Sequence, residues 1–464
     1  MSRQPDQRPI FGAGAVLNAI FSLALMAAGT GNARAYLDVT LCNSANVDLW
    51  DCFDLVSLYN ATDGDNWTNN TNWGSPNVDS WHGVIVDGVS HRVIAIDLAF
   101  NGLDGEFPPA MYGLQQLEFL QLSVNGLYGE LPAYLGDLSS LEFLQVGSND
   151  LQGSLPSSLG NLSRLENLYL TGNRLSGSIP ASFGNLTRLE VLDISSDGMY
   201  PSERLSGPLP DLSGLTRLRR INLERNELDG PLPAYLGQLP LLEELRLWHN
   251  HFSGAIPASL GNLGNLRVLD LAENDLTGAL PASLGNLGAL EELDLSVNDF
   301  TSTLPPTLGN LAQLRTLNIR GSVFNPQMNL TGPIPASFAN LGQLEEMNLA
   351  FNRLSGALPA CLGNLDNLQA MNLQGNELIG AIPEAFTALK LQTLYLGLNF
   401  LDADGSGQLI TTPTIETWLN GIPDTENYIV GFGWIDTRDQ RIMPNDPDTV
   451  FISGFESAIS SACP

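Results

Sequence analysis

Basic and aromatic side chains gather between residues 219 and 267, and they are Arg219, Arg220, Arg225, Arg246, Trp248, His249 and Arg267. Arginine and tryptophan are enriched among the residues that dominate protein–protein binding energies. Asp270 and Asp294 follow at one interval of 24 residues, and they would suit a partner of mixed charge. The chemistry that these residue types predict is recognition of a macromolecule.

The same segment allows a second interpretation. Glu224, Glu243 and Glu244 lie close by in the sequence, and they would neutralise the arginines in surface ion pairs. Such pairs contribute little to stability.

A catalytic group does not stand out. The four histidines are His82, His91, His249 and His251, and the sequence has no H-E-x-x-H, G-x-S-x-G or C-x-x-C motif. His249, Asp270 and Ser296 can be imagined as a triad, but an open sheet offers neither a water-excluding pocket nor an oxyanion hole. We therefore expect a binding protein and not an enzyme.

One segment resembles the first half of an EF-hand loop. Asp402, Asp404 and Ser406 occupy positions one, three and five, and Gly407 occupies position six. Position twelve, which normally supplies a bidentate carboxylate, is Pro413. Calcium binding here is one interpretation, and a polar turn is the other. We expect no other cofactor.

The elements that position these residues come from a repeat of about 24 residues, which runs from residue 93 to residue 400. Aligned on one asparagine, it has the pattern L-x-x-L-x-x-L-x-L-x-x-N-x-L-x-G-x-(I/L)-P-x-x-(L/F)-G-N. The asparagines are Asn101, Asn125, Asn149, Asn173, Asn226, Asn250, Asn274, Asn298, Asn352, Asn376 and Asn399. A fixed period of this size predicts a solenoid whose units bury their apolar faces against one another.

Each unit contains one short strand and one turn. In the unit around Leu144 to Val146, apolar and polar residues alternate, which predicts a strand with Gln145 facing outward. We expect these strands to pair in parallel and to line a concave face. The amide of Asn149 should satisfy backbone groups after the strand, and stacked copies should form an interior ladder. Ser157 to Asn161 is the expected convex turn.

The coils resemble the plant-type leucine-rich repeat, most clearly at Leu175–Pro180 and Leu276–Pro281. Plant receptor ectodomains and polygalacturonase-inhibiting proteins have repeats of this class. The resemblance implies an α/β repeat solenoid, a leucine-rich-repeat horseshoe or superhelix with parallel strands on the concave face and short helical or 3-10 turns on the convex face. It does not choose a ligand, because one fold serves many functions.

Two coils are longer than the others, because about six extra residues follow the strand in the segments 195–204 and 320–329. Insertions in repeat proteins map to loops on one face and often assist binding. The alternative is loop growth that costs little entropy.

The ends of the repeat array are expected to carry caps. We assign residues 36–92 to an N-terminal cap, with a helix near Val47 to Tyr59. The segments Tyr59–Trp73 and Trp81–Val84 resemble the cap of bacterial secreted leucine-rich-repeat proteins. Its tryptophans should cover the first coil, with a sugar-binding cluster as the alternative.

We assign residues 401–443 to a C-terminal cap, with a short helix near Thr414 to Gly421. Tyr428, Phe432 and Trp434 are expected to cover the last coil. Residues 444–464 form a tail whose segment Asp446–Glu456 resembles a short ending of exported gammaproteobacterial proteins. A sorting or attachment role is a hypothesis.

Residues 1–35 have the pattern of a secretory signal peptide. Arg3 and Arg8 precede an apolar stretch from Ile10 to Ala28, and Ala33–Ala35 fits a cleavage site. A single membrane anchor is the alternative. Cleavage predicts a secreted or cell-surface protein that does not insert into the membrane.

The net charge of −30 argues against nucleic acid and anionic lipid as partners, because their phosphates need a basic surface. The four cysteines of an exported chain suggest disulfides. We predict a bridge between Cys42 and Cys52. Cys361 and Cys463 either pair with each other or remain thiols.

These observations predict an exported bacterial leucine-rich-repeat protein that binds a protein partner on its concave face. A glycan-binding adhesin that uses Tyr169, Trp248 and Tyr395 is the alternative, and a structural cell-surface protein is a third class.

Overall fold

The computed structural model describes residues 36–108, 111–200, 202–321, 330–397, 399, 401 and 412–422. The signal segment, the calcium-loop residues Asp402, Asp404 and Ser406, and the tail 444–464 lie outside the described residues. The same holds for Cys463 and for the aromatic residues predicted at 428, 432 and 434. Among the described residues, no helix has the length and apolar character needed to cross a bilayer.

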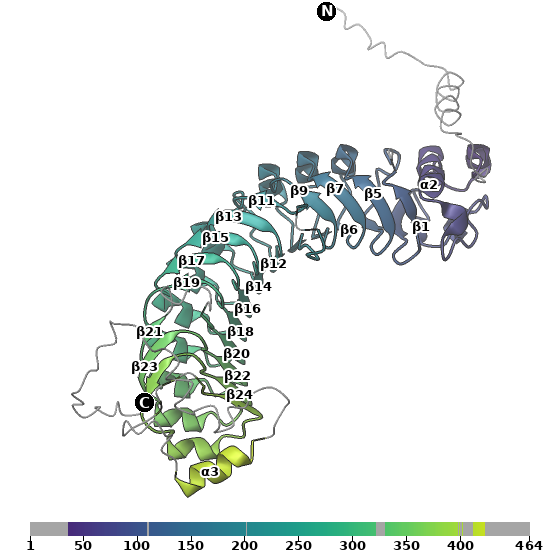
Figure 1. Cartoon of the computed structure of the whole chain (residues 1–464). Helices are drawn as coiled ribbons and strands as arrows, with labels where there is room; N and C mark the ends of the chain where they lie inside the picture. Colours follow the sequence, from purple (N-terminus) through teal and green to yellow (C-terminus); the bar gives the residue numbers. More distant parts are fainter. Residues whose placement is uncertain are drawn as a thin grey trace, which may run out of the picture. The chain divides into compact units, whose positions relative to one another are not determined.

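A 14-stranded sheet follows the repeat from coil to coil (Figure 1). Only β1 and β2 are antiparallel, and each later strand pairs in parallel with the strand of the next coil. From β4 onward, the central residue of each three-residue strand of this sheet is buried and its two neighbours are outward, as the alternating pattern predicts. The strands are β1 (Val84–Val86), β2 (Val93–Asp97), β4 (Phe119–Gln121), β6 (Phe143–Gln145), β8 (Asn167–Tyr169), β10 (Val191–Asp193), β12 (Arg220–Asn222), β14 (Glu244–Arg246), β16 (Val268–Asp270), β18 (Glu292–Asp294), β20 (Thr316–Asn318), β22 (Glu346–Asn348), β24 (Ala370–Asn372) and β26 (Thr393–Tyr395).

A second row of short parallel strands, absent from the sequence prediction, forms three smaller sheets. The breaks fall at the two long coils, where only the isolated bridges Gly177–Leu205 and Thr303–Thr331 remain. The strands are β3 (Asp104–Glu106), β5 (Gly126–Glu130), β7 (Asp150–Ser154), β9 (Arg174–Ser176), β11 (Ser206–Gly207), β13 (Glu227–Pro231), β15 (His251–Gly254), β17 (Asp275–Gly278), β19 (Asp299–Phe300), β21 (Thr331–Gly332), β23 (Arg353–Ala357) and β25 (Glu377–Ile379).

The predicted turns are 3-10 helices, and a proline precedes each one because its fixed φ suits the entry. They pack against one another so closely that a Cβ at Gly160 would lie 2.4 Å from the carbonyl oxygen of Ser182. This contact explains the glycine of the repeat. The helices are η5 (Ala133–Asp137), η6 (Ser157–Asn161), η7 (Ala181–Asn185), η8 (Ala234–Gln238), η9 (Ala258–Asn262), η10 (Ala282–Asn286), η11 (Pro306–Asn310), η13 (Ala336–Asn340), η14 (Ala360–Asn364) and η15 (Glu384–Ala388).

The repeat asparagines form the expected interior ladder. Nδ2 of Asn274 donates to the carbonyl oxygens of Leu247 (3.1 Å), Leu271 (3.1 Å) and Ala272 (3.0 Å), and its Oδ1 accepts from the backbone N–H of Phe252 (3.0 Å). One side chain thus satisfies buried backbone groups in its own coil and in the preceding coil. Because unpaired buried groups are costly, the ladder fixes the stacking of the coils.

The segment predicted as the N-terminal cap contains α2 (Leu49–Ala61), close to the helix predicted at 47–59, together with η2 (Val39–Ser44), η3 (Gly64–Asn66) and η4 (Val78–Ser80). The predicted disulfide between Cys42 and Cys52 is present. Trp67, Trp73 and Trp81 are buried and pack on one another. Their burial fits a structural role over the first coil, because buried ring faces cannot stack on a sugar.

The other end carries α3 (Pro413–Asn420), at the position of the predicted helix. Thr412 caps its N-terminus through its side-chain oxygen, which accepts from the backbone N–H of Ile415 (3.3 Å). Nε1 of Trp418 donates to the carbonyl oxygen of Leu389 (3.1 Å), which ties α3 to the last coils. Cys361 is buried in η14, where its thiol donates to the carbonyl oxygen of Ala336 (3.6 Å).

The ladder gives a first prediction. We expect Asn274→Ala to lower the free energy of unfolding by about 2 kcal/mol or more, because it leaves buried backbone groups unpaired. Urea denaturation followed by circular dichroism measures the loss. The control is Asn286→Ala at the exposed end of η10, which should change stability by about 0.5 kcal/mol or less. Equal losses in the two variants would contradict the structural role of the ladder.

Candidate partner-binding face

The outward side of the 14-stranded sheet, here called the sheet face, carries most of the predicted site residues. The outward residue that ends each strand stands beside its counterpart in the next coil, so Arg246 pairs in register with Asn222 on one side and Asp270 on the other. Asp270 in turn pairs with Asp294. The structure therefore places these side chains in one row, as the asparagine alignment predicts.

Three arginines of the predicted island are held by glutamates of the next coil. Arg220 contacts Glu244 at 2.9 Å, and Nε and Nη2 of Arg267 contact the two carboxylate oxygens of Glu291 at 2.9 and 3.0 Å. Arg219 is paired in the same way with Glu243. The neutralising interpretation describes these three residues, because each guanidinium group is hydrogen-bonded to a glutamate of the next coil.

Arg246 differs from its neighbours. Its guanidinium lies 3.6 Å from Glu244, 3.6 Å from Glu292 and 4.0 Å from Glu224, and its side chain is 29% exposed. These distances exceed a hydrogen bond. Among the described residues, Arg246 therefore has a favourable electrostatic setting but no hydrogen-bond acceptor for its side chain.

Trp248 lies two residues beyond the end of β14, between the buried Leu247 and the exposed His249. The guanidinium of Arg225 lies 4.6 Å from the centre of its ring, a cation–π contact that covers one ring face. Nη1 of Arg225 also donates to the carbonyl oxygen of Asp197, 3.1 Å away, in the first long coil. The inserted loop is thus connected to Trp248 through Arg225.

Asp197 occupies the ladder position of that long coil, where most coils have asparagine. Its Oδ1 accepts from the backbone N–H of Met199 at 2.8 Å, so the carboxylate shapes the inserted loop. Further along the loop, Glu203 pairs with Arg174, and Arg174 also lies 4.5 Å from the ring centre of Tyr200. The loop is packed onto the solenoid on both sides.

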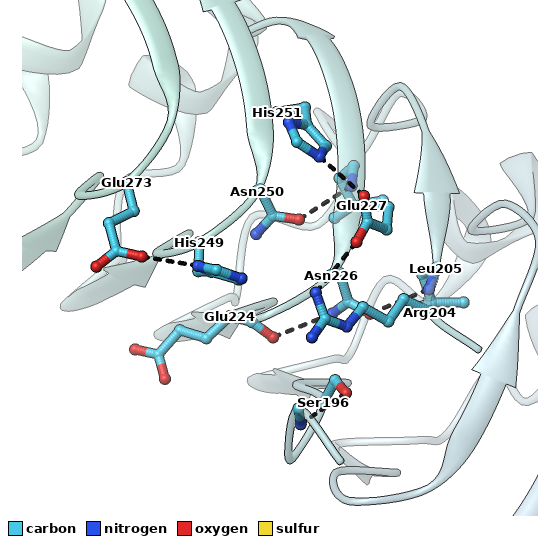
Figure 2. A network of polar contacts seen from close by, with 12 residues as sticks. Ser196, Arg204, Leu205, Glu224, Asn226, Glu227, His249, Asn250, His251 and Glu273 are labelled. Carbon is cyan, nitrogen blue, oxygen red and sulfur yellow. Dashed lines mark hydrogen bonds and ion pairs between the residues drawn. The ribbon is translucent and has the colours of Figure 1, made fainter. Parts of the chain in front are cut away.

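Two histidines line a hollow of about 430 Å³ at the edge of the sheet face. His249 Nδ1 lies 2.7 Å from Glu273, and His251 contacts Glu227 at 2.8 Å (Figure 2). His251 also contacts Asp275 at 3.3 Å. Burial lowers the pKa of the His251 imidazole, but its hydrogen bonds to Glu227 and Asp275 outweigh this effect and raise the pKa above its usual value. The imagined triad does not form, since His249 is bonded to Glu273 and Asp270 accepts from the backbone of Ala272.

Asp270 lies at the acidic centre of the sheet face. Burial raises the pKa of its carboxyl to about 7, and the negative charges of Asp294, Glu224 and Glu292 add to the increase. Asn318 donates to Asp294 at 2.8 Å, which satisfies one of the neighbouring carboxylates. Within the described ranges, no group of three or more His, Cys, Asp or Glu is arranged to hold a metal ion.

The sequence reasoning missed several residues of this face. The residues not predicted from the sequence are the acidic partners Glu273 and Glu291, together with His251 and Arg320 at the hollow. Alignment of every repeat position, and not only of the one that ends each strand, would have revealed them. Side chains at equal repeat positions become neighbours in a solenoid.

The acidic centre gives a pH-dependent prediction. Between about pH 4 and pH 7 the folded protein keeps a proton on Asp270 that the unfolded chain has lost, so this residue makes stability fall as pH rises through its folded pKa. We expect Asp270→Asn to be more stable than wild type by roughly 2–4 kcal/mol at pH 8, and by little near pH 4. Urea midpoints at both pH values measure this. The exposed Asp229→Asn is the control, and a pH-independent gain for Asp270→Asn would contradict the prediction.

Comparisons with known proteins agree with this architecture. The leucine-rich repeat region model matches residues 92–253 and 203–355, and the leucine-rich repeat model matches residues 367–389. No curated protein sequence matches the chain.

Among solved structures, PEPR1 in its complex with AtPEP1 is 34% identical over 75% of this chain and 48% of that one, with a TM-score of 0.68. The plant peptide hormone receptor RGFR1 in complex with RGF2 is 34% identical over 66% of this chain and 51% of that one, with a TM-score of 0.57. A leucine-rich-repeat protein of Leptospira interrogans is 29% identical over 69% of this chain and 75% of that one, with a TM-score of 0.54. The chain spans about half the length of the two plant receptor structures.

The repeat period, the asparagine ladder, the coil-by-coil sheet and a family model that matches more than half of the chain all agree. The chain belongs to the leucine-rich repeat family.

Proposed function

We propose that the protein is an exported interaction module that binds a protein partner on its sheet face, with the contact centred on Arg246 and Trp248. One observation carries the proposal. Arg219, Arg220 and Arg267 are engaged by glutamates, whereas Arg246 has no hydrogen-bonded partner for its side chain among the described residues. A partner can therefore use its donors without first breaking a tight ion pair.

The chemistry of the centre describes the partner. The donors of Arg246 suit a carboxylate or a backbone carbonyl group, and the exposed part of Trp248 suits an apolar side chain. Asp270 and then Asp294 follow Arg246 in the same row, so a basic group of the partner would be favourable next to its acidic group, most of all above pH 7, where Asp270 carries its charge. Opposite charges in fixed positions select partners and orient them during encounter.

The comparisons support a polypeptide as the class of ligand. The structures of PEPR1 and RGFR1 are complexes with AtPEP1 and RGF2, and RGFR1 is described as a peptide hormone receptor. Those ligands belong to those proteins. They show that a solenoid of this repeat class serves as a receptor for peptides.

Export is part of the proposal. The Cys42–Cys52 disulfide supports it, because disulfides persist in oxidising compartments, and the signal-like N-terminus points in the same direction. Attachment at the cell surface and a bacterial source remain predictions from the resemblance of the cap and the tail.

The glycan-binding alternative is less well supported. Tyr169 and Tyr395 end β8 and β26, and Trp248 lies two residues beyond β14, so two strands separate the first pair of coils and five separate the second. At about 4.8 Å per strand, the intervals are roughly 14 and 29 Å. Arg225 also covers one face of Trp248. Three rings this far from one another do not form one sugar-stacking platform.

The test begins with a displayed peptide library panned on the wild-type protein, followed by calorimetry with each selected peptide. We expect Arg246→Glu combined with Trp248→Ala to weaken binding by about 30-fold or more, since each hot-spot residue contributes about 2 kcal/mol. Both side chains are partly exposed, so the variant should keep its circular dichroism spectrum and melting temperature.

The matched control is Arg353→Glu with Tyr395→Ala, which also replaces one arginine by glutamate and one aromatic residue by alanine, at positions away from Arg246 and Trp248. Unchanged affinity in the Arg246/Trp248 variant would place the binding site elsewhere. Selection of no peptide, together with a positive glycan array, would favour the glycan-binding alternative.

A further inference from the structure

One column of the sheet face alternates in charge through the second half of the solenoid. Seven residues before each ladder position, successive coils carry Arg219, Glu243, Arg267, Glu291, Arg315 and Glu345. Arg219 pairs with Glu243, Arg267 with Glu291, and Arg315 with Glu345 at 2.7 Å. In this half of the solenoid, each arginine of the column is therefore neutralised by the glutamate of the next coil.

The same column has only one sign of charge in the first half. Glu118, Glu142, Glu166 and Glu190 occupy four successive coils, and the backbone N–H of each of the last three donates at 2.8 Å to the carbonyl oxygen of the preceding glutamate. Among the described residues, only Glu190 has an ion-pair partner, Arg219 at 3.8 Å. Like charges on adjacent strands destabilise a sheet. A cationic partner would relieve this repulsion.

Aromatic residues stand beside these carboxylates on the same face. Phe119 and Phe143 are directly paired in register, with ring centres 4.4 Å apart and planes inclined by 11°. Tyr169 continues the row, with its ring centre 5.7 Å from that of Phe143. All three side chains are only partly buried. They therefore leave apolar surface in contact with water, which a partner would bury favourably.

The stacking restricts what this surface can hold. Phe119 and Phe143 cover each other's ring faces, so a sugar ring cannot lie between them. Phosphate-bearing partners are disfavoured by the row of glutamates. A segment that carries both positive charge and apolar side chains matches both columns.

We propose that the outward side of β4, β6, β8 and β10 is a second docking surface, which binds an extended basic segment of a partner polypeptide with apolar residues between its basic ones. The four glutamates span about 14 Å at roughly 4.8 Å per strand. Basic residues at three alternate positions of an extended chain span about 13 Å at roughly 3.3 Å per residue. Alternate side chains point to opposite sides, so the basic ones face the glutamates and the apolar ones face the aromatic row.

This second docking surface extends the proposed function. It rests on that proposal in one respect only, namely that the partner is a polypeptide. It lies on different strands from Arg246 and Trp248 and uses the opposite charge. One partner can contact both surfaces, or each can act alone, and the two are tested separately.

The test uses a short fluorescent peptide that alternates lysine with phenylalanine, titrated with the full chain and followed by anisotropy. One comparison peptide has serine in place of phenylalanine, and another has glutamate in place of lysine. We expect wild type to bind the lysine–phenylalanine peptide at least about tenfold more tightly than either comparison peptide. Glu142→Gln with Glu166→Gln should weaken this binding at least about tenfold.

The matched control is Glu243→Gln with Glu291→Gln, which makes the same change in the same column where arginines already neutralise it. This control should retain affinity within about twofold. The Glu142/Glu166 variant should melt no lower than wild type, since it removes repulsion and not a contact. Any loss of binding is then separated from unfolding.

Three outcomes would overturn the inference. These are no binding of the lysine–phenylalanine peptide to wild type, equal binding of the lysine–serine peptide, and an equal effect of the two glutamine variants. Arg246→Glu with Trp248→Ala should leave the peptide's affinity unchanged. If that variant loses the library-selected ligands but still binds the lysine–phenylalanine peptide, the result concerns the proposed function alone. Failure of one proposal is therefore distinguishable from failure of the other.

Discussion

The pairing of each ladder asparagine with backbone groups of two coils is the interaction on which the rest of the structure depends. Asn274 bridges Leu247 in one coil to Leu271 in its own, and the other buried asparagines repeat this arrangement. Because the amide must reach the preceding coil, the coils stack in a single register. Residues at equal repeat positions then stand about 4.8 Å apart. Every feature of the sheet face follows from this, since the solenoid converts a repeat position into a column of neighbouring side chains.

The sequence was sufficient for those parts of the fold that the repeat specifies. Buried leucines, outward residues, proline-initiated turns and the ladder all follow from one pattern of 24 residues, because each local choice agrees with the others. The second row of strands was not predicted, since L-x-G segments with a glycine at positive φ, such as Gly153 (φ +81°), have the composition of a loop. Their pairing arises only after the first sheet has brought the coils together.

The candidate site was predicted in composition but not in detail. Counting arginines placed an island between residues 219 and 267, and the structure brings Arg220, Arg246 and Asp270 onto adjacent strands. Which arginine remains available depends on a difference in distance of less than one ångström, since Glu244 lies 2.9 Å from Arg220 and 3.6 Å from Arg246. Side-chain competition of this kind is decided by rotamers and packing, which no repeat pattern contains.

The first long coil shows what happens where the ladder is interrupted. Asp197 lacks the amide donors of asparagine, and its carboxylate accepts from Met199 in its own loop instead of tying two coils together. The second row of strands breaks at this coil, while the main sheet continues from β10 to β12. A solenoid can therefore accept an insertion where it loses one ladder residue, because the parallel sheet still holds the register. The inserted loop accepts a hydrogen bond from Arg225, and Arg225 packs on the ring of Trp248. The coil that lacks a ladder asparagine is therefore connected to Trp248, which the proposed function places at the centre of the contact.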